Sequence, residues 1–120
     1  MDAKTLSKEQ LIEEFDEVLE FTLKHGLKTA DGTRLKNGVL REITGKDQVA
    51  ASNDNRVKSG NKAVEGFIYI SKTAYIEVSD NEYRPITFDE ATSLKNSDVA
   101  VILKVIAELA EDADFLSLKQ

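Results

Sequence analysis

The sequence predicts a single α+β domain in which an N-terminal β-hairpin packs with a small bundle of about four helices. Three observations support this prediction. Apolar and polar residues alternate over residues 19–23, as in a half-buried strand with one solvated face. Asp31-Gly32 is a turn signal that separates this stretch from a second strand-like stretch. Helical patterns, several of them preceded by N-cap residues, account for most of the remainder of the 120-residue chain.

The composition is that of a soluble globular protein, with 41% hydrophobic and 32% charged residues. The chain contains no Cys, which excludes a disulfide framework and a thiolate metal site. No apolar run is long enough to span a bilayer, and residues 1–10 hold no apolar signal core. We therefore expect one cytoplasmic domain over residues 1–120, without a membrane partner.

The first expected element is a helix over residues 8–15. Ser7 is a suitable N-cap for it, and Gln10 stands three residues later, as in a capping box. Glutamates near the start of this helix favour its formation through the helix dipole.

The expected hairpin follows this helix. Its first strand covers residues 19–23, a polar segment over residues 25–33 reverses the chain, and the second strand covers residues 35–43. Asn37-Gly38 lies within the second strand and is either a bulge or a second turn.

The next helix is expected to end at about residue 52, with Thr44 as its N-cap and Asp47 as the acidic partner. A polar loop over residues 53–60 follows it.

Residues 63–78 are ambiguous, because they combine a helical apolar face with two β-prone segments, G-F-I-Y-I and A-Y-I-E-V. We favour a helix through about Ala74, and a strand stays open as the alternative. Residues 79–81 mark a turn, and Pro85 ends any regular element before it.

Two helices are expected in the last third of the chain. Thr87 and Glu90 form a capping box for a short helix that ends at about Leu94. Asn96 or Ser97 then caps the last helix, which runs to about residue 110.

The last helix is apolar on most of its surface, with one narrow polar stripe at Lys104, Glu108 and Glu111. A surface helix of a monomer usually buries a narrower face. Two interpretations are therefore open: the helix is central to the core, or one side of it packs on a partner or a second copy. In the second case, Val101 and Val105 would lie on the less buried side. The candidate contact residues on this helix are Val101, Val105 and Leu109.

The residue pattern predicts no enzyme, no cofactor and no metal site. His25 is the only histidine, and the sequence shows no partner with which it would act as a base or ligand. The carboxylates of residues 13–17 lack the spacing of a calcium loop. The glycines form no phosphate-binding pattern, and no serine lies in a nucleophile-elbow context.

Charge is unevenly distributed along the chain. The net charge is −5 over residues 1–23, +5 over residues 24–62 and −6 over residues 63–120, for a total of −6. The negative total disfavours nonspecific binding to nucleic acid. The alternation of sign would let copies attract one another head to tail, although a solvated surface without such a role is the simpler interpretation. Arg41 and Lys46, in the basic block, are further candidates for partner or self-association contacts.

Three segments resemble the phage tail assembly chaperones of contractile-tailed phages and prophages. They are the strand and turn that end in A-D-G at residues 30–32, L-R-E-I-T-G-K-D at residues 40–47 and S-L-K-N-S-D-V-A-V-I-L at residues 93–103. The resemblance covers residues 18–110 and implies that these residues form the family-like core. Residues 1–17 form an N-terminal helical extension that departs from the commonest family pattern, and residues 111–120 form a C-terminal tail.

The resemblance implies a non-enzymatic assembly factor in the cytoplasm of a bacterial host. Such proteins bind the long, largely helical tape measure protein and keep it soluble while tail tube protein polymerises around it. It also implies many copies and therefore a homo-oligomer. The alternatives are a minor structural tail or baseplate component and an acidic inhibitor that mimics DNA. The basic block speaks against the DNA mimic, which needs a continuous acidic face.

Overall fold

A four-stranded antiparallel sheet, in the order β1-β2-β3-β4, forms the centre of the protein. The computed structural model describes residues 5–58 and 63–112. The strands are β1 (Val18–Lys28), β2 (Arg34–Arg41), β3 (Ala74–Ser79) and β4 (Glu82–Pro85). The α+β class is confirmed. The N-terminal hairpin is present, but a second hairpin extends it into a sheet that the sequence did not predict.

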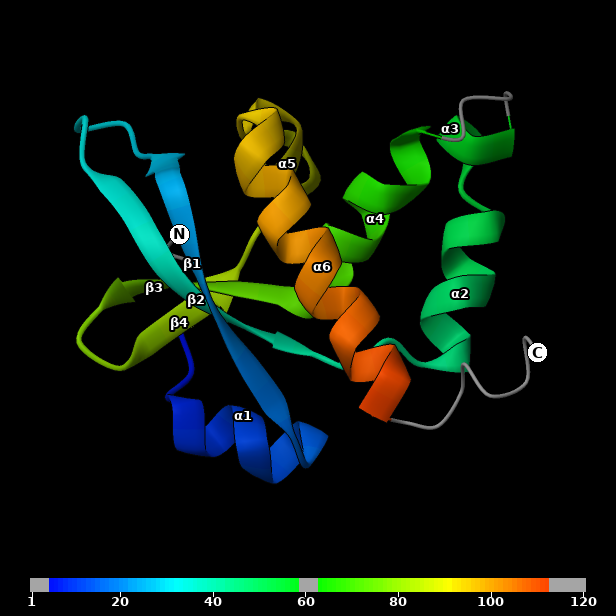
Figure 1. Cartoon of the computed structure of the whole chain (residues 1–120), viewed down its shortest axis with the longest axis horizontal. Coiled ribbons are helices and arrows are strands. Elements are labelled where there is room, and N and C mark those ends of the chain that lie inside the picture. Colours follow the sequence, from blue (N-terminus) through cyan, green and yellow to red (C-terminus); the bar gives the residue numbers. More distant parts are fainter. Residues whose placement is uncertain (1–4, 59–62, 113–120) are drawn as a thin grey trace.

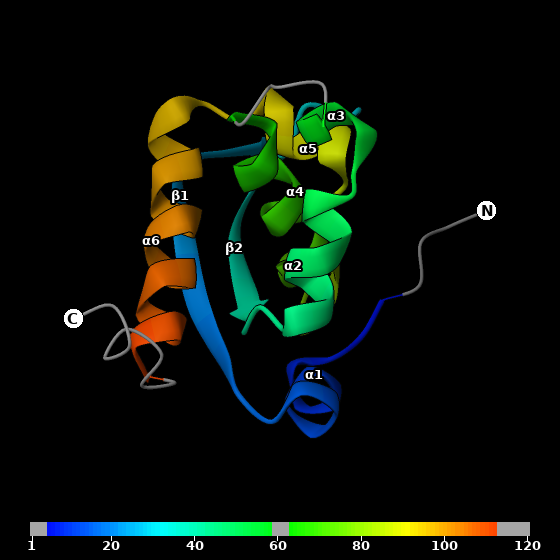
Figure 2. The same cartoon turned by 90° about the vertical axis from the view of Figure 1, so that its right-hand side faces the viewer.

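Helices pack on both faces of this sheet (Figures 1 and 2). Helix α6 crosses one face over β1 and β2, and α4 lies between α6 and α2 in both views. The short helix α1 lies at the lower end of Figure 1. The helices are α1 (Lys8–Phe15), α2 (Gly45–Ser52), α3 (Asn55–Lys58), α4 (Ala63–Thr73), α5 (Phe88–Ser93) and α6 (Asn96–Asp112).

Alternation along the strands divides the core between the two faces. Leu40 and Ile76 contribute to the larger cluster, which also contains Ile102 and Leu109 of α6. The neighbouring strand residue Val39 belongs to a smaller cluster with Leu11 of α1. The side of α6 that carries Ile102, Val105 and Leu109 covers the larger cluster, as the first of the two interpretations expects.

Local cap signals predicted three helices correctly. Ser7 with Gln10, Thr44 with Asp47 and Thr87 with Glu90 each form both reciprocal hydrogen bonds of a capping box. These caps start α1, α2 and α5 within a residue of the predicted positions.

The ambiguous segment is a helix followed directly by a strand. Helix α4 ends at Thr73, one residue before the predicted end, and A-Y-I-E-V forms most of β3. Pro85 ends a regular element, as predicted, but that element is the strand β4, which the sequence did not predict. The predicted loop over residues 53–60 is wrong in part, because residues 55–58 form α3; residues 59 and 60 lie outside the described part of the chain.

The irregularity in the first hairpin lies in β1, not at Asn37-Gly38. The register of the β1–β2 pairing shifts between Thr22 and Leu27, and Gly26 has a positive φ of 91° there. Strand β1 therefore continues to Lys28, beyond the predicted end at residue 23. Gly38 pairs with both Phe21 and Ile76 in the regular ladder, so neither the bulge nor the turn predicted at Asn37-Gly38 exists.

Candidate functional site

The segment L-R-E-I-T-G-K-D forms the junction between β2 and α2, and Asp47 is its centre. The Asp47 carboxylate accepts hydrogen bonds from the Thr44 N–H at 2.8 Å and from both terminal nitrogens of Arg41 at 2.8 and 3.1 Å. Burial raises the pKa of Asp47, but hydrogen bonds from Arg41 and Thr44 outweigh burial, so its pKa lies below the ordinary value. The Asp47 carboxylate is therefore charged in the folded chain and holds β2 and α2 together.

Arg41 links this junction to two other elements, α4 and α1. Its guanidinium donates to the Lys72 carbonyl at 2.9 Å, at the end of α4, and lies 5.1 Å from the centre of the Phe15 ring of α1. The hydrogen bond with Asp47 raises the pKa of Arg41. Arg41, predicted as a partner contact, thus has intramolecular partners on α1, α2 and α4.

The third motif segment makes a second joint, through Asp98 at the start of α6. Its fully buried carboxylate accepts hydrogen bonds from the backbone N–H groups of Lys24 at 2.6 Å, His25 at 3.2 Å and Gly26 at 3.0 Å. Burial raises the pKa of Asp98, but these three backbone donors outweigh burial and leave the pKa below its ordinary value. The irregular part of β1 is therefore held by a charge on α6.

His25 has an exposed side chain, and it contributes its backbone N–H to Asp98. Within residues 5–58 and 63–112, no group of three or more His, Asp or Glu side chains is placed to hold a metal ion. In the same part of the chain, no helix has the length and apolar character needed to cross a membrane.

The prediction that Val105 lies on the less buried side of the last helix is wrong. Val105 is 9% exposed and Leu109 is 1% exposed, because both side chains pack in the core that α6 forms with the sheet. Val101 is half-buried at the edge of that core, and Lys46 is exposed on α2. Of the predicted contact residues, Lys46 is therefore the most accessible.

Other apolar side chains are exposed instead. They are Ile12 on α1 at 41%, Val49 on α2 at 62% and Leu103 on α6 at 38%. Leu103 leans over Gly66 of α4, where an added Cβ would lie 3.7 and 3.8 Å from the two Leu103 methyl groups. Nothing in the sequence distinguished Leu103 from the other apolar residues of this helix.

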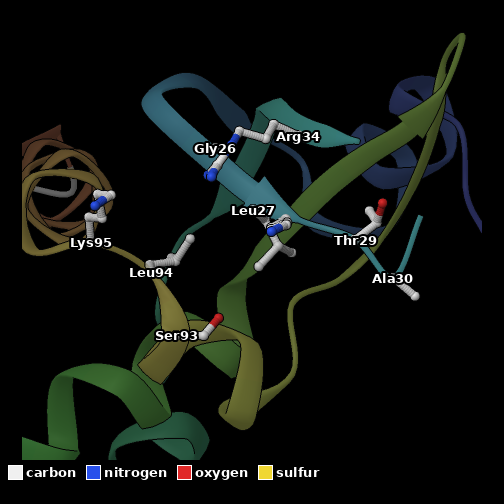
Figure 3. A pocket seen from close by; sticks show the side chains of 9 residues that line it. Gly26, Leu27, Thr29, Ala30, Arg34, Ser93, Leu94 and Lys95 are labelled. Atoms are coloured by element: carbon white, nitrogen blue, oxygen red, sulfur yellow. The ribbon is translucent and has the colours of Figure 1, made fainter. Parts of the chain in front are cut away.

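A basic pocket of about 490 Å³ lies between the turn end of the first hairpin and the α5–α6 connection. The side chains of Leu27 and Leu94 are buried beneath it. In Figure 3, Leu94 and Lys95 of the connection lie across from Leu27, Arg34 and the rest of the hairpin side. Its cationic lining residues are Lys28, Arg34 and Lys95.

The acidic counterpart lies at the other end of the molecule. Helix α1 is at the lower end of Figure 1, whereas the β1–β2 turn and α5 are at the upper end. The side chains of Glu13, Asp16 and Glu17 are exposed on and just after α1. The acidic residues of α1 and the cationic pocket thus lie at opposite ends of the molecule.

Comparisons with protein-family models, with curated proteins and with solved structures find no match for this chain.

Proposed function

We propose that this chain is a tail assembly chaperone of a contractile-tailed phage or prophage. It binds the tape measure protein and tail tube protein in the cytoplasm of the bacterial host, without catalysis, and keeps the tape measure chain soluble during tail assembly. The core of the chaperone is residues 18–110, the hairpin and the helices that pack with it.

One observation carries the proposal: the second and third family-like segments each form a joint between elements of the fold. Asp98 of the third segment binds the backbone of β1 just before the A-D-G turn. Arg41 and Asp47 of the second segment join β2 to α2. A short motif whose residues hold two elements together is more informative about family than the same residues on a solvated loop, because only some residue types can form the required hydrogen bonds.

The surface between α4 and α6 is the proposed contact for a tape measure helix. Leu103 is 38% exposed there and lies over Gly66 of α4, so it presents apolar surface between the two helices. An amphipathic helix laid against a shallow apolar surface is a common recognition mode. Many weak contacts along a long helix would give high avidity without a deep pocket.

Co-expression with the tape measure protein of the same phage or prophage tests the proposal. We expect the tape measure chain to be insoluble alone, soluble with this protein, and recovered in a complex with it. Leu103→Asp should reduce that recovery by at least about tenfold, whereas Val49→Asp, at an exposed apolar residue on another helix, should not.

Two results would count against the proposal. A tape measure chain that is equally soluble with and without this protein would remove the chaperone role. Mass spectrometry of purified virions that finds this chain in stoichiometric amounts would favour the minor tail or baseplate component instead.

A further inference from the structure

We propose that copies of this chain associate head to tail, with Ile12 of one copy inserted into the basic pocket of the next. The contact is between unlike surfaces: helix α1 on one copy, and the first hairpin with the α5–α6 connection on the other. It needs no tape measure protein and does not depend on the proposed chaperone role.

The pocket offers both an apolar floor and unpaired positive charge. Leu27 and Leu94 line it from below and are 2% and 7% exposed. Lys28, Arg34 and Lys95 line it as well, and within the described residues none of the three forms an ion pair. The volume of about 490 Å³ is ample for an aliphatic side chain and the ends of neighbouring carboxylates.

The one carboxylate in the hairpin turn does not neutralise these cations. Asp31 accepts hydrogen bonds from the Thr29 hydroxyl and the Thr33 N–H. It lines a separate pocket on the other side of the turn, with Val78 and Arg84. The cations therefore face solvent and are available to a negatively charged partner.

Helix α1 has the complementary arrangement. Ile12 is 41% exposed, although Leu11 beside it is fully buried. Glu9 and Asp16 stand three residues before and four residues after Ile12, so they lie on the same side of the helix as its exposed side chain. An apolar side chain flanked by two carboxylates is complementary to an apolar floor flanked by cations.

A second copy is the occupant because each copy carries both halves of the contact at opposite ends (Figure 1). Such a contact leaves one free pocket and one free α1 at the ends of any chain of copies. Association of this type therefore continues into filaments, or closes into a ring if the rotation between copies permits.

Sedimentation velocity of the purified full chain, alone, is the first test. We expect species larger than a dimer that grow with concentration, and association roughly tenfold weaker at high than at low salt, since exposed charges are screened. A wild-type chain that stays monomeric up to about 1 mM would overturn the proposal, even if the pocket bound an acidic segment of another protein.

Two variants then test the direction of the contact. Ile12→Lys removes the exposed apolar side chain of α1 and adds a positive charge that the pocket repels. The double variant Lys28→Glu with Lys95→Glu reverses the charge of the pocket. Each variant alone should be monomeric. The matched controls Val49→Lys and Lys104→Glu change exposed residues elsewhere and should associate as the wild type does.

A mixture of the Ile12→Lys variant and the double variant Lys28→Glu with Lys95→Glu gives the deciding result. One retains an intact pocket and the other an intact α1, so the mixture should form 1:1 dimers and nothing larger. A mixture that stays monomeric, or either variant that alone associates as the wild type does, would overturn the proposal. Circular dichroism that matches the wild type confirms that each variant is folded.

Discussion

The Asp98 carboxylate accepts a hydrogen bond from the Gly26 N–H at 3.0 Å, across 72 residues of sequence. Lys24 and His25 donate to the same carboxylate, so the start of α6 holds the irregular part of β1 in place. The basic pocket is built beside this joint, since Gly26 and Lys95 both line it. The joint therefore connects the stability of the fold to the position of the proposed interface.

Asp98→Asn should lower the free energy of unfolding by about 3 kcal/mol, because it replaces a buried charge that accepts three backbone hydrogen bonds with a neutral amide. Urea unfolding at neutral pH measures the loss. Asp80→Asn, in the exposed turn between β3 and β4, is the matched control and should change stability by less than about 0.5 kcal/mol. Equal effects of the two substitutions would show that the Asp98 joint contributes little.

Stability should fall as the pH is lowered below about 4. The pKa values of Asp98 and Asp47 lie below their ordinary value in the folded chain. A depressed folded pKa contributes stability that is present above the unfolded pKa and is lost as the pH falls through the folded one. The difference in unfolding free energy between wild type and Asp98→Asn should therefore shrink as the pH is lowered from 7 to about 3. A difference that is constant over this range would contradict the assignment.

The helices that begin with a capping box were predictable because the signal lies within four consecutive residues. Thr44 and Asp47, for example, satisfy each other's backbone N–H groups without help from the rest of the chain. Strand β4 was not predictable in this way. It is short and ends in Pro85. It forms because it pairs with β3 on one side and because Leu6 pairs with Tyr83 on the other.

The candidate interface was harder to predict than the fold. Helix α6 is apolar on nearly all sides, so the sequence did not show that Val105 and Leu109 face the sheet while Leu103 faces outward. The basic pocket combines Lys28 and Arg34 with Lys95, and only the sheet and α6 bring these distant residues together. Periodicity predicts which residues share a helical face, but not which neighbour covers that face.

Arg41→Lys should destabilise the protein by about 2 kcal/mol although it retains the positive charge. A lysine cannot make the two parallel bonds to Asp47 and the bond to the Lys72 carbonyl at once. Arg84→Lys is the matched comparison, since Arg84 also bonds both oxygens of Glu90 but the pair is more exposed. We expect it to cost about 1 kcal/mol or less in thermal or urea unfolding. A larger cost for Arg84→Lys would mean that burial does not determine the strength of these pairs.

Gly38→Ala and Gly45→Ala should have opposite effects on stability. A Cβ at Gly38 would lie 2.3 Å from the Phe21 ring and 2.5 Å from the Tyr75 carbonyl oxygen. The ring could turn aside, but the carbonyl belongs to the β2–β3 ladder, so the sheet itself must shift. We expect a loss of at least about 2 kcal/mol, or failure to fold.

Gly45 is the first residue of α2, where nothing lies within 4 Å of an added Cβ and the φ angle is not positive. Alanine at this position should therefore raise the free energy of unfolding by about 0.5 kcal/mol, because it restricts the unfolded chain and favours the helix. Urea unfolding of the two variants under the same conditions gives both values. A Gly38→Ala variant as stable as wild type would mean that β2 and β3 are not packed as closely as this sheet requires.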